Sequence, residues 1–102
     1  MPEELDWKHY EDEKMPDFWL EVAEDAHDLC VRGPSHAIGY VTTLAEKADQ
    51  VECDKLFHGG GIEVTPCDKM TYLHGPKKVM LSFIRLAIRS GPGPLEKMVI
   101  GD

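Results

Sequence analysis

Four carboxylates in the first third of the chain have a spacing that could gather them on one surface. Glu21, Glu24, Asp25 and Asp28 lie three or four positions apart. If this stretch is helical, the four side chains fall on one face of the helix, roughly opposite its apolar residues. Such a charged face is typical of a solvated helix surface, and it also suits a divalent cation or a basic macromolecule.

A second carboxylate pair, Glu46 and Asp49, follows on the next predicted helix. The combined Glu-x-x-Glu and Glu-x-x-Asp pattern resembles that of MazG-like nucleotide pyrophosphohydrolases over residues 16–56. The resemblance implies an all-α fold in which Glu21, Glu24, Glu46 and Asp49 hold magnesium, which prefers oxygen ligands, against the phosphates of a nucleotide. This chain departs from the family because its second pair lies at the end of a helix rather than near the start. A magnesium-dependent hydrolase is therefore the alternative function.

Two cysteines and two histidines form a second candidate metal set. Cys53, His58, Cys67 and His74 offer the sulfur and nitrogen ligands that zinc prefers. None of their separations is the two-residue spacing typical of structural zinc sites, so unrelated thiols and loop histidines are the simpler interpretation. A zinc-stabilised interaction module is the second alternative, and we expect no bound cofactor.

Trp7 and Tyr10 stand out in residues 1–15, where six residues are acidic. They are three positions apart, so one helical turn would align their rings. Tryptophan and tyrosine are frequent anchors of protein interfaces. We predict that residues 1–15 form an acidic arm whose aromatic rings either fold back onto the domain or dock onto a partner.

The negative charge of the chain is concentrated at its start. Eleven of the nineteen acidic residues lie in residues 1–28, together with only two basic ones, Lys8 and Lys14, and the whole chain carries −8. This balance disfavours nucleic acids and anionic membranes, which bind mainly to lysine and arginine. No apolar run approaches the roughly 20 residues of a spanning helix. Three cysteines without a Cys-x-x-Cys pair favour reduced thiols and a cytoplasmic location.

Hydrophobic periodicity predicts three helices. The first covers residues 16–32, the second starts at Ser35, and the third extends from Gly75-Pro76 to Gly91. Apolar residues cover more than half of the third helix, which therefore lies at the centre of the core or in an oligomer interface. We favour a homodimer, because large apolar patches are rare on soluble monomers and twofold dimers are the commonest oligomers.

The remaining pattern predicts a small sheet. Residues 62–65 and 70–73 alternate between apolar and polar side chains around a turn at 66–69, which is typical of a β-hairpin. Residues 95–100 could add a third strand. No internal repeat or low-complexity tract is evident. The prediction is one globular α+β domain over residues 16–102, with three packed helices and a small antiparallel β-hairpin or three-stranded sheet.

The leading function is that of a small acidic, non-catalytic protein that binds a protein with a basic surface, as an inhibitor or adaptor. Small viral and phage inhibitors have a similar composition. The acids would steer the partner electrostatically and raise the rate of encounter, while the aromatic side chains supply affinity. The predicted partner-binding residues are Trp7, Tyr10, Glu21, Glu24, Asp25 and Asp28.

Overall fold

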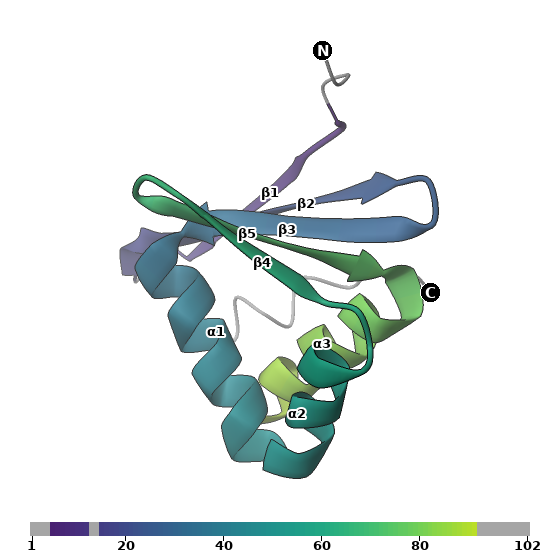
Figure 1. The fold of residues 1–102 in the computed structure, drawn as a ribbon. Helices are drawn as coiled ribbons and strands as arrows, with labels where there is room; N and C mark the ends of the chain where they lie inside the picture. Colours follow the sequence, from purple (N-terminus) through teal and green to yellow (C-terminus); the bar gives the residue numbers. More distant parts are fainter. Residues whose placement is uncertain (1–4, 13–14, 92–102) are drawn as a thin grey trace.

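The computed structural model describes residues 5–12 and 15–91. Five strands form one sheet, and three helices pack against it (Figure 1). The order of the strands is β1-β2-β3-β5-β4, and every neighbouring pair is antiparallel. The elements are β1 (Lys8–Asp12), β2 (Met15–Asp25), β3 (Asp28–Pro34), α1 (Ser35–Ala48), α2 (Gln50–His58), β4 (Glu63–Cys67), β5 (Met70–Pro76) and α3 (Lys77–Ser90).

The predicted α+β class is correct in kind, but the predicted sheet of a hairpin or three strands is wrong. Residues 16–32, expected to be the first helix, belong to the β2–β3 hairpin instead. Phe18, Leu20 and Val22 alternate inward, so the apolar residues of this segment fit a strand as well as a helix. Pairing with two neighbouring strands decides between the two. The strand expected at residues 95–100 lies outside the described residues.

The predicted hairpin and the other two predicted helices are present, but the second helix ends at Ala48 and a separate helix, α2, follows it. The hairpin predicted around residues 66–69 is the β4–β5 pair, in which Cys67 faces Met70 across the turn. Helices begin at Ser35 and Lys77, directly after Pro34 and Pro76. The described part of the segment expected to be an arm includes strand β1, which pairs with β2.

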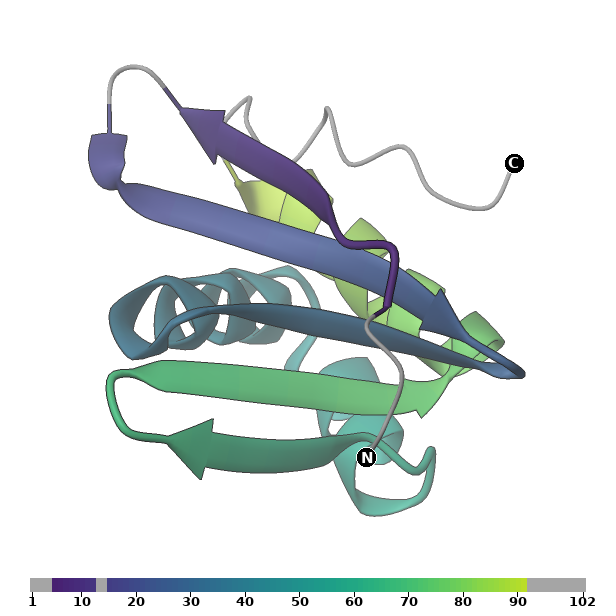
Figure 2. The ribbon, with the colours of Figure 1, turned by 90° about the horizontal axis from the view of Figure 1, so that it is seen from above.

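All three helices lie on one side of the sheet (Figure 1), and no described helix covers the other side (Figure 2). The core fills the space between α1, α3 and the inward residues of β2, β3 and β5. Its largest fully buried side chains are Phe83, Leu20, Leu29, Leu73, Met80 and Cys53. Each such side chain stabilises the fold by about 1.5–3 kcal/mol relative to exposure.

The apolar surface of α3 is covered within the chain itself. Met80, Phe83, Ile84, Leu86 and Ala87 are all buried. Phe83 packs edge-on against Phe57 of α2, with ring centroids 5.4 Å apart. The exposed apolar helix that motivated the homodimer prediction is therefore not found, and the homodimer itself stays a prediction.

The two halves of the molecule have the same architecture. Adding 42 to the residue numbers of β3 gives those of β5, and adding 42 to those of α1 gives those of α3. The strands β2 and β4 end at Asp25 and Cys67, which are also 42 residues apart. Each half is thus a hairpin followed by a 14-residue helix, β2–β3–α1 and β4–β5–α3. The expectation that the chain contains no internal repeat is wrong.

The repeat is hidden in the sequence because few side chains are shared. Residues 15–48 and 57–90 are identical at only six positions, among them Glu21 and Glu63. The two halves meet in the middle of the sheet, where β3 and β5 pair around a pseudo-twofold axis. The central pair is Val31–Leu73, with Cys30–His74 and Arg32–Tyr72 on either side.

Candidate functional site

The side of the sheet that faces away from the helices is the candidate site, and we call it the open face. Side chains alternate along each strand, so every second residue of β2, β3 and β5 points away from the core. The strand register then shows which residues share this side. They include His9, Glu11, Trp19, Glu21, Ala23, Asp25, Asp28, Cys30, Arg32, Glu63, Thr65, Cys67, Met70, Tyr72 and His74.

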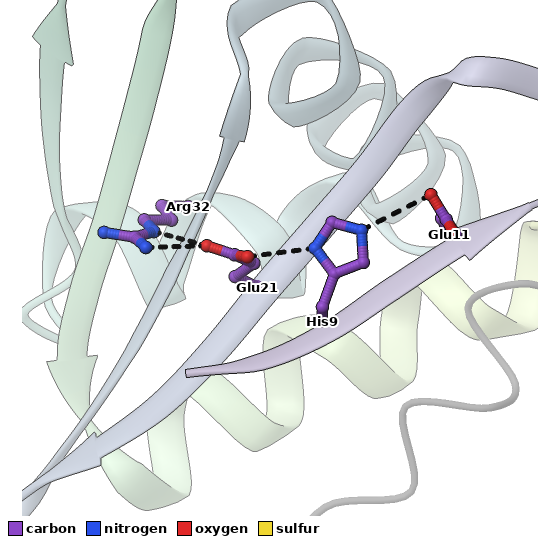
Figure 3. Close-up of polar contacts among 4 residues, drawn as sticks. All are labelled: His9, Glu11, Glu21 and Arg32. Atoms are coloured by element: carbon purple, nitrogen blue, oxygen red, sulfur yellow. Dashed lines mark hydrogen bonds and ion pairs between the residues drawn. The ribbon is translucent and has the colours of Figure 1, made fainter. Parts of the chain in front are cut away.

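A row of charged side chains crosses the first three strands of the open face (Figure 3). Glu21 of β2 lies between His9 of β1 and Arg32 of β3. Its Oε2 is 2.9 Å from Nδ1 of His9, and its Oε1 accepts a 2.7 Å hydrogen bond from Nε of Arg32. Nη2 of Arg32 is also 2.7 Å from Oε1. Both carboxylate oxygens of Glu21 are therefore engaged.

Both tryptophans of the chain lie over this row. The Trp7 ring covers Arg32, whose Cζ is 3.9 Å from the ring centroid. Trp19 stacks on His9 with a centroid distance of 5.5 Å. On the far side of Arg32, the Tyr72 ring centroid is 6.0 Å from the guanidinium carbon. The open face thus carries three aromatic rings, each next to a basic side chain.

The second half of the open face repeats this arrangement with a different base. His74 of β5 takes the position that Arg32 has in the first half, and Glu63 of β4 takes that of Glu21. Nε2 of His74 is 3.4 Å from Oε2 of Glu63, and its Nδ1 is 3.9 Å from Oδ2 of Asp28. Glu63 is 71% exposed and Glu21 only 19%. The second site is therefore far more accessible to solvent.

The contacts within the row shift the pKa values of its members. The hydrogen bond to Glu21 raises the pKa of His9, against a smaller lowering by burial. Burial acts to raise the pKa of Glu21, but hydrogen bonds from His9 and Arg32 outweigh it and lower the pKa. Burial likewise acts to lower the pKa of Arg32, and its contacts with Glu21 reverse the sign. The row thus favours charged forms of all three groups.

Cys30 places a thiol on the open face. Burial raises the pKa of its thiol, and the negative charges of Asp25 and Asp28 raise it further. Reactive cysteines require the opposite, a positive environment that favours the thiolate. The surroundings of Cys30 therefore suit a structural thiol and disfavour covalent chemistry.

The structure separates the sequence-predicted partner-binding residues. Trp7, Glu21, Asp25 and Asp28 lie on the open face, the last two beside the β2–β3 turn. Glu24 points the other way and pairs with Lys77 at the start of α3, an ion pair that lowers the pKa of this carboxyl group.

Tyr10 also faces the helices, where it packs against the core. The acidic face of four residues on one helix does not exist, because the segment is a hairpin.

Sequence reasoning missed four aromatic or basic residues of the open face, and it considered a fifth, His74, only as a zinc ligand. His9, Trp19, Arg32, Tyr72 and His74 come from four different strands. Only the strand register brings them together, and no local pattern in the sequence signals it. Glu63 was visible as part of a predicted strand, but its equivalence to Glu21 depends on the structural repeat.

The predicted magnesium set is dispersed in the structure. Glu21 and Glu24 project from opposite sides of β2, and Glu21 is held by Arg32. Asp49 caps α2, where its Oδ1 accepts a hydrogen bond from the backbone N–H of Glu52. The sheet is also incompatible with the all-α fold that the resemblance to MazG-like enzymes implies.

The predicted zinc ligands are likewise spread over several elements. Cys53 is buried in α2, Cys67 is exposed at the end of β4, and His74 lies on the open face. His58 ends α2. Residues 5–12 and 15–91 contain no group of three or more histidine, cysteine, aspartate or glutamate side chains that could hold a metal ion. The geometry gives the zinc hypothesis no support.

A shallow hollow of about 450 Å³ lies beside β2 and α1. Met15, Phe18 and Tyr40 make most of its wall. Nε2 of His36 donates a 2.8 Å hydrogen bond to the backbone oxygen of Asp17 there. It lacks the convergent polar groups that fix a small ligand. The open face is therefore the stronger candidate site.

The chain matches no known family model, no curated protein and no solved structure. Within the described part of the chain, none of the helices has the length and apolarity needed to cross a membrane. The site must accordingly be interpreted from its own chemistry.

Proposed function

We propose that this protein is a non-catalytic binding module that captures a protein with a basic surface, as an inhibitor or adaptor in the cytoplasm. The observation that carries the proposal is the composition of the open face. It bears five carboxylates and one guanidinium, together with both tryptophans of the chain. The carboxylates are Glu11, Glu21, Asp25, Asp28 and Glu63.

The shape of the open face supports a broad protein contact. A sheet face without a helical cover is broad and open (Figure 2), whereas small molecules bind in concave pockets, so this face suits another protein better. Trp7, Trp19 and Tyr72 supply the kind of aromatic anchors that dominate binding energy at interfaces. The acids around them attract a positively charged partner and raise its rate of association. The proposal keeps Trp7, Glu21, Asp25 and Asp28 from the sequence-based set and adds Trp19, Glu63 and Tyr72.

The β4 edge of the sheet is less suited to binding by strand addition. Strand β4 is exposed along its length, but Pro66 lies within it. Proline lacks the backbone N–H that an added strand would use, and it is a common means of protecting sheet edges. We therefore place the partner on the open face rather than along β4.

The test uses a capped peptide of alternating arginine and serine as a defined basic probe. Because both tryptophans lie on the open face, their fluorescence reports binding there. We expect saturable binding at low salt. The affinity should fall steeply as salt is added, because charges separated by more than about 10 Å are screened from each other at an ionic strength of 0.1 M. A variant with Asp25→Asn, Asp28→Asn and Glu63→Gln should associate more slowly.

A matched variant separates local binding from attraction by net charge. Glu46→Gln, Glu52→Gln and Asp54→Asn remove the same three charges from the helical layer and leave the open face intact. This control should bind the probe nearly as well as the unmodified protein. Equal weakening in the two variants, or no binding at low salt, would refute the open face as the binding site.

A further inference from the structure

His9 lies between two carboxylates on the open face. Its Nδ1 is 2.9 Å from Glu21, and its Nε2 is 3.4 Å from Glu11 of the same strand. The Trp19 ring stacks on the imidazole of His9. Arg32 is linked to His9 through Glu21 (Figure 3).

His74 also lies between two carboxylates, in the second half of the sheet, at longer distances of 3.4 and 3.9 Å. Its Nδ1 faces Asp28 of β3, and its Nε2 faces Glu63 of β4. Cys30 is its cross-strand neighbour. Asp25, opposite Asp28 at the turn, adds negative charge to this end of the open face.

An imidazole between two carboxylates satisfies both only when it is protonated. The neutral ring has one N–H donor and one lone pair, so one carboxylate always faces an acceptor. The protonated ring donates to both. The raised pKa of His9 agrees with this geometry.

We infer that His9 and His74 couple partner binding to protons, so that a basic partner binds the open face more weakly as the pH falls. The inference rests on the proposed function. Protons on these two rings and basic side chains of the partner compete for the same four carboxylates. Binding therefore releases protons, and acidification adds two positive charges to the surface that the partner approaches.

The structural repeat shows why the two halves of the open face differ in their response to pH. In the first half Glu21 is held by Arg32, which stays charged at every accessible pH. In the second half the equivalent partner of Glu63 is His74, which carries charge only when protonated. Glu63 of the second half is thus paired with a ring that can lose its charge, whereas Glu21 of the first half is paired with a permanent charge.

The experiment measures the affinity of the capped arginine–serine peptide at constant low salt. The two pH values, about 8 and about 5.5, lie on either side of the ordinary pKa of histidine. The peptide has no group that titrates in this interval. One added charge about 6 Å from a bound cation lowers affinity roughly three-fold in water-like surroundings, so two lower it about ten-fold. We expect this ten-fold loss in the unmodified protein.

Two double variants locate the effect. His9→Gln with His74→Gln should bind at both pH values with nearly equal affinity. His36→Gln with His58→Gln, histidines of the helical layer, should keep the full pH dependence. Urea unfolding of each variant verifies that it is folded.

The outcomes distinguish this inference from the proposed function. Equal affinity of the unmodified protein at both pH values overturns the inference alone. A pH dependence that persists without His9 and His74 overturns it as well. Absence of binding at either pH overturns the proposed function and the inference together.

Discussion

Arg32 and His74 stand at equivalent positions in the two halves of the sheet, each opposite a glutamate on the neighbouring strand, β2 or β4. Arg32 contacts Glu21 through two nitrogens, and His74 contacts Glu63 through one. The first pair is partly buried under Trp7, and the second is open to solvent. The same backbone position thus carries a structural ion pair in one half and an exposed, titratable contact in the other.

Replacing Arg32 by lysine should free the Trp7 ring from its contact with residue 32 and expose it to solvent. A lysine cannot make the two hydrogen bonds that Arg32 directs to Glu21, and it does not stack flat on an indole ring. We expect a loss of about 1 kcal/mol in unfolding free energy and greater quenching of Trp7 by acrylamide. The measurement is made with Trp19→Phe in both proteins, so that Trp7 alone emits. Unchanged quenching would show that the stacking does not persist in solution.

Replacing Ala26 by glycine should stabilise the protein. Ala26 begins the two-residue turn between β2 and β3 and has φ of 55°, a left-handed conformation that costs a residue with a side chain roughly 1–2 kcal/mol. After the entropy cost of glycine, the expected gain is about 0.5–1 kcal/mol in urea unfolding. His27→Gly is the control and should give no gain, because His27 is not left-handed. A loss of stability in Ala26→Gly would contradict this turn geometry.

Two glycine-to-alanine substitutions should have opposite signs. A Cβ at Gly33 would lie 2.6 Å from the backbone oxygen of Trp19, so Gly33→Ala should cost about 1–3 kcal/mol through overpacking. Gly39 lies in α1 with nothing within 4 Å of a Cβ, so Gly39→Ala should gain about 0.5–1 kcal/mol from helix propensity. Thermal and urea unfolding measure both. A neutral Gly33→Ala would argue against the close approach of β3 to β2.

Replacing His9 by glutamine should reduce stability at low pH more than at high pH. The pKa of His9 is raised in the folded state, so its contribution is fully present below the ordinary histidine pKa and is lost as the pH rises through the folded value. The effect is small, because His9 is 45% exposed. Melting temperatures of the two proteins at about pH 5.5 and 8 provide the test. A larger difference at the higher pH would have the wrong sign.

The sequence by itself determined the local features that depend on short-range chemistry. Gly33-Pro34 and Gly75-Pro76 mark the starts of α1 and α3, because proline fits the beginning of a helix and lacks the backbone N–H that a strand ladder uses. The alternation around residues 66–69 defines the β4–β5 hairpin. The concentration of acids near the start of the chain likewise follows from composition alone.

Only the tertiary structure decided the state of residues 16–32 and the composition of the open face. The spacing of the apolar residues in this segment fits both a helix and a strand. Its turn at Ala26 also lacks the glycine or asparagine that usually marks such a hairpin. Hydrogen bonds to β1 and β3, formed with residues distant in sequence, select the strand. The same long-range register joins Glu21 to Arg32 and Glu63 to His74, because side chains on neighbouring strands meet only once pairing has fixed their alignment.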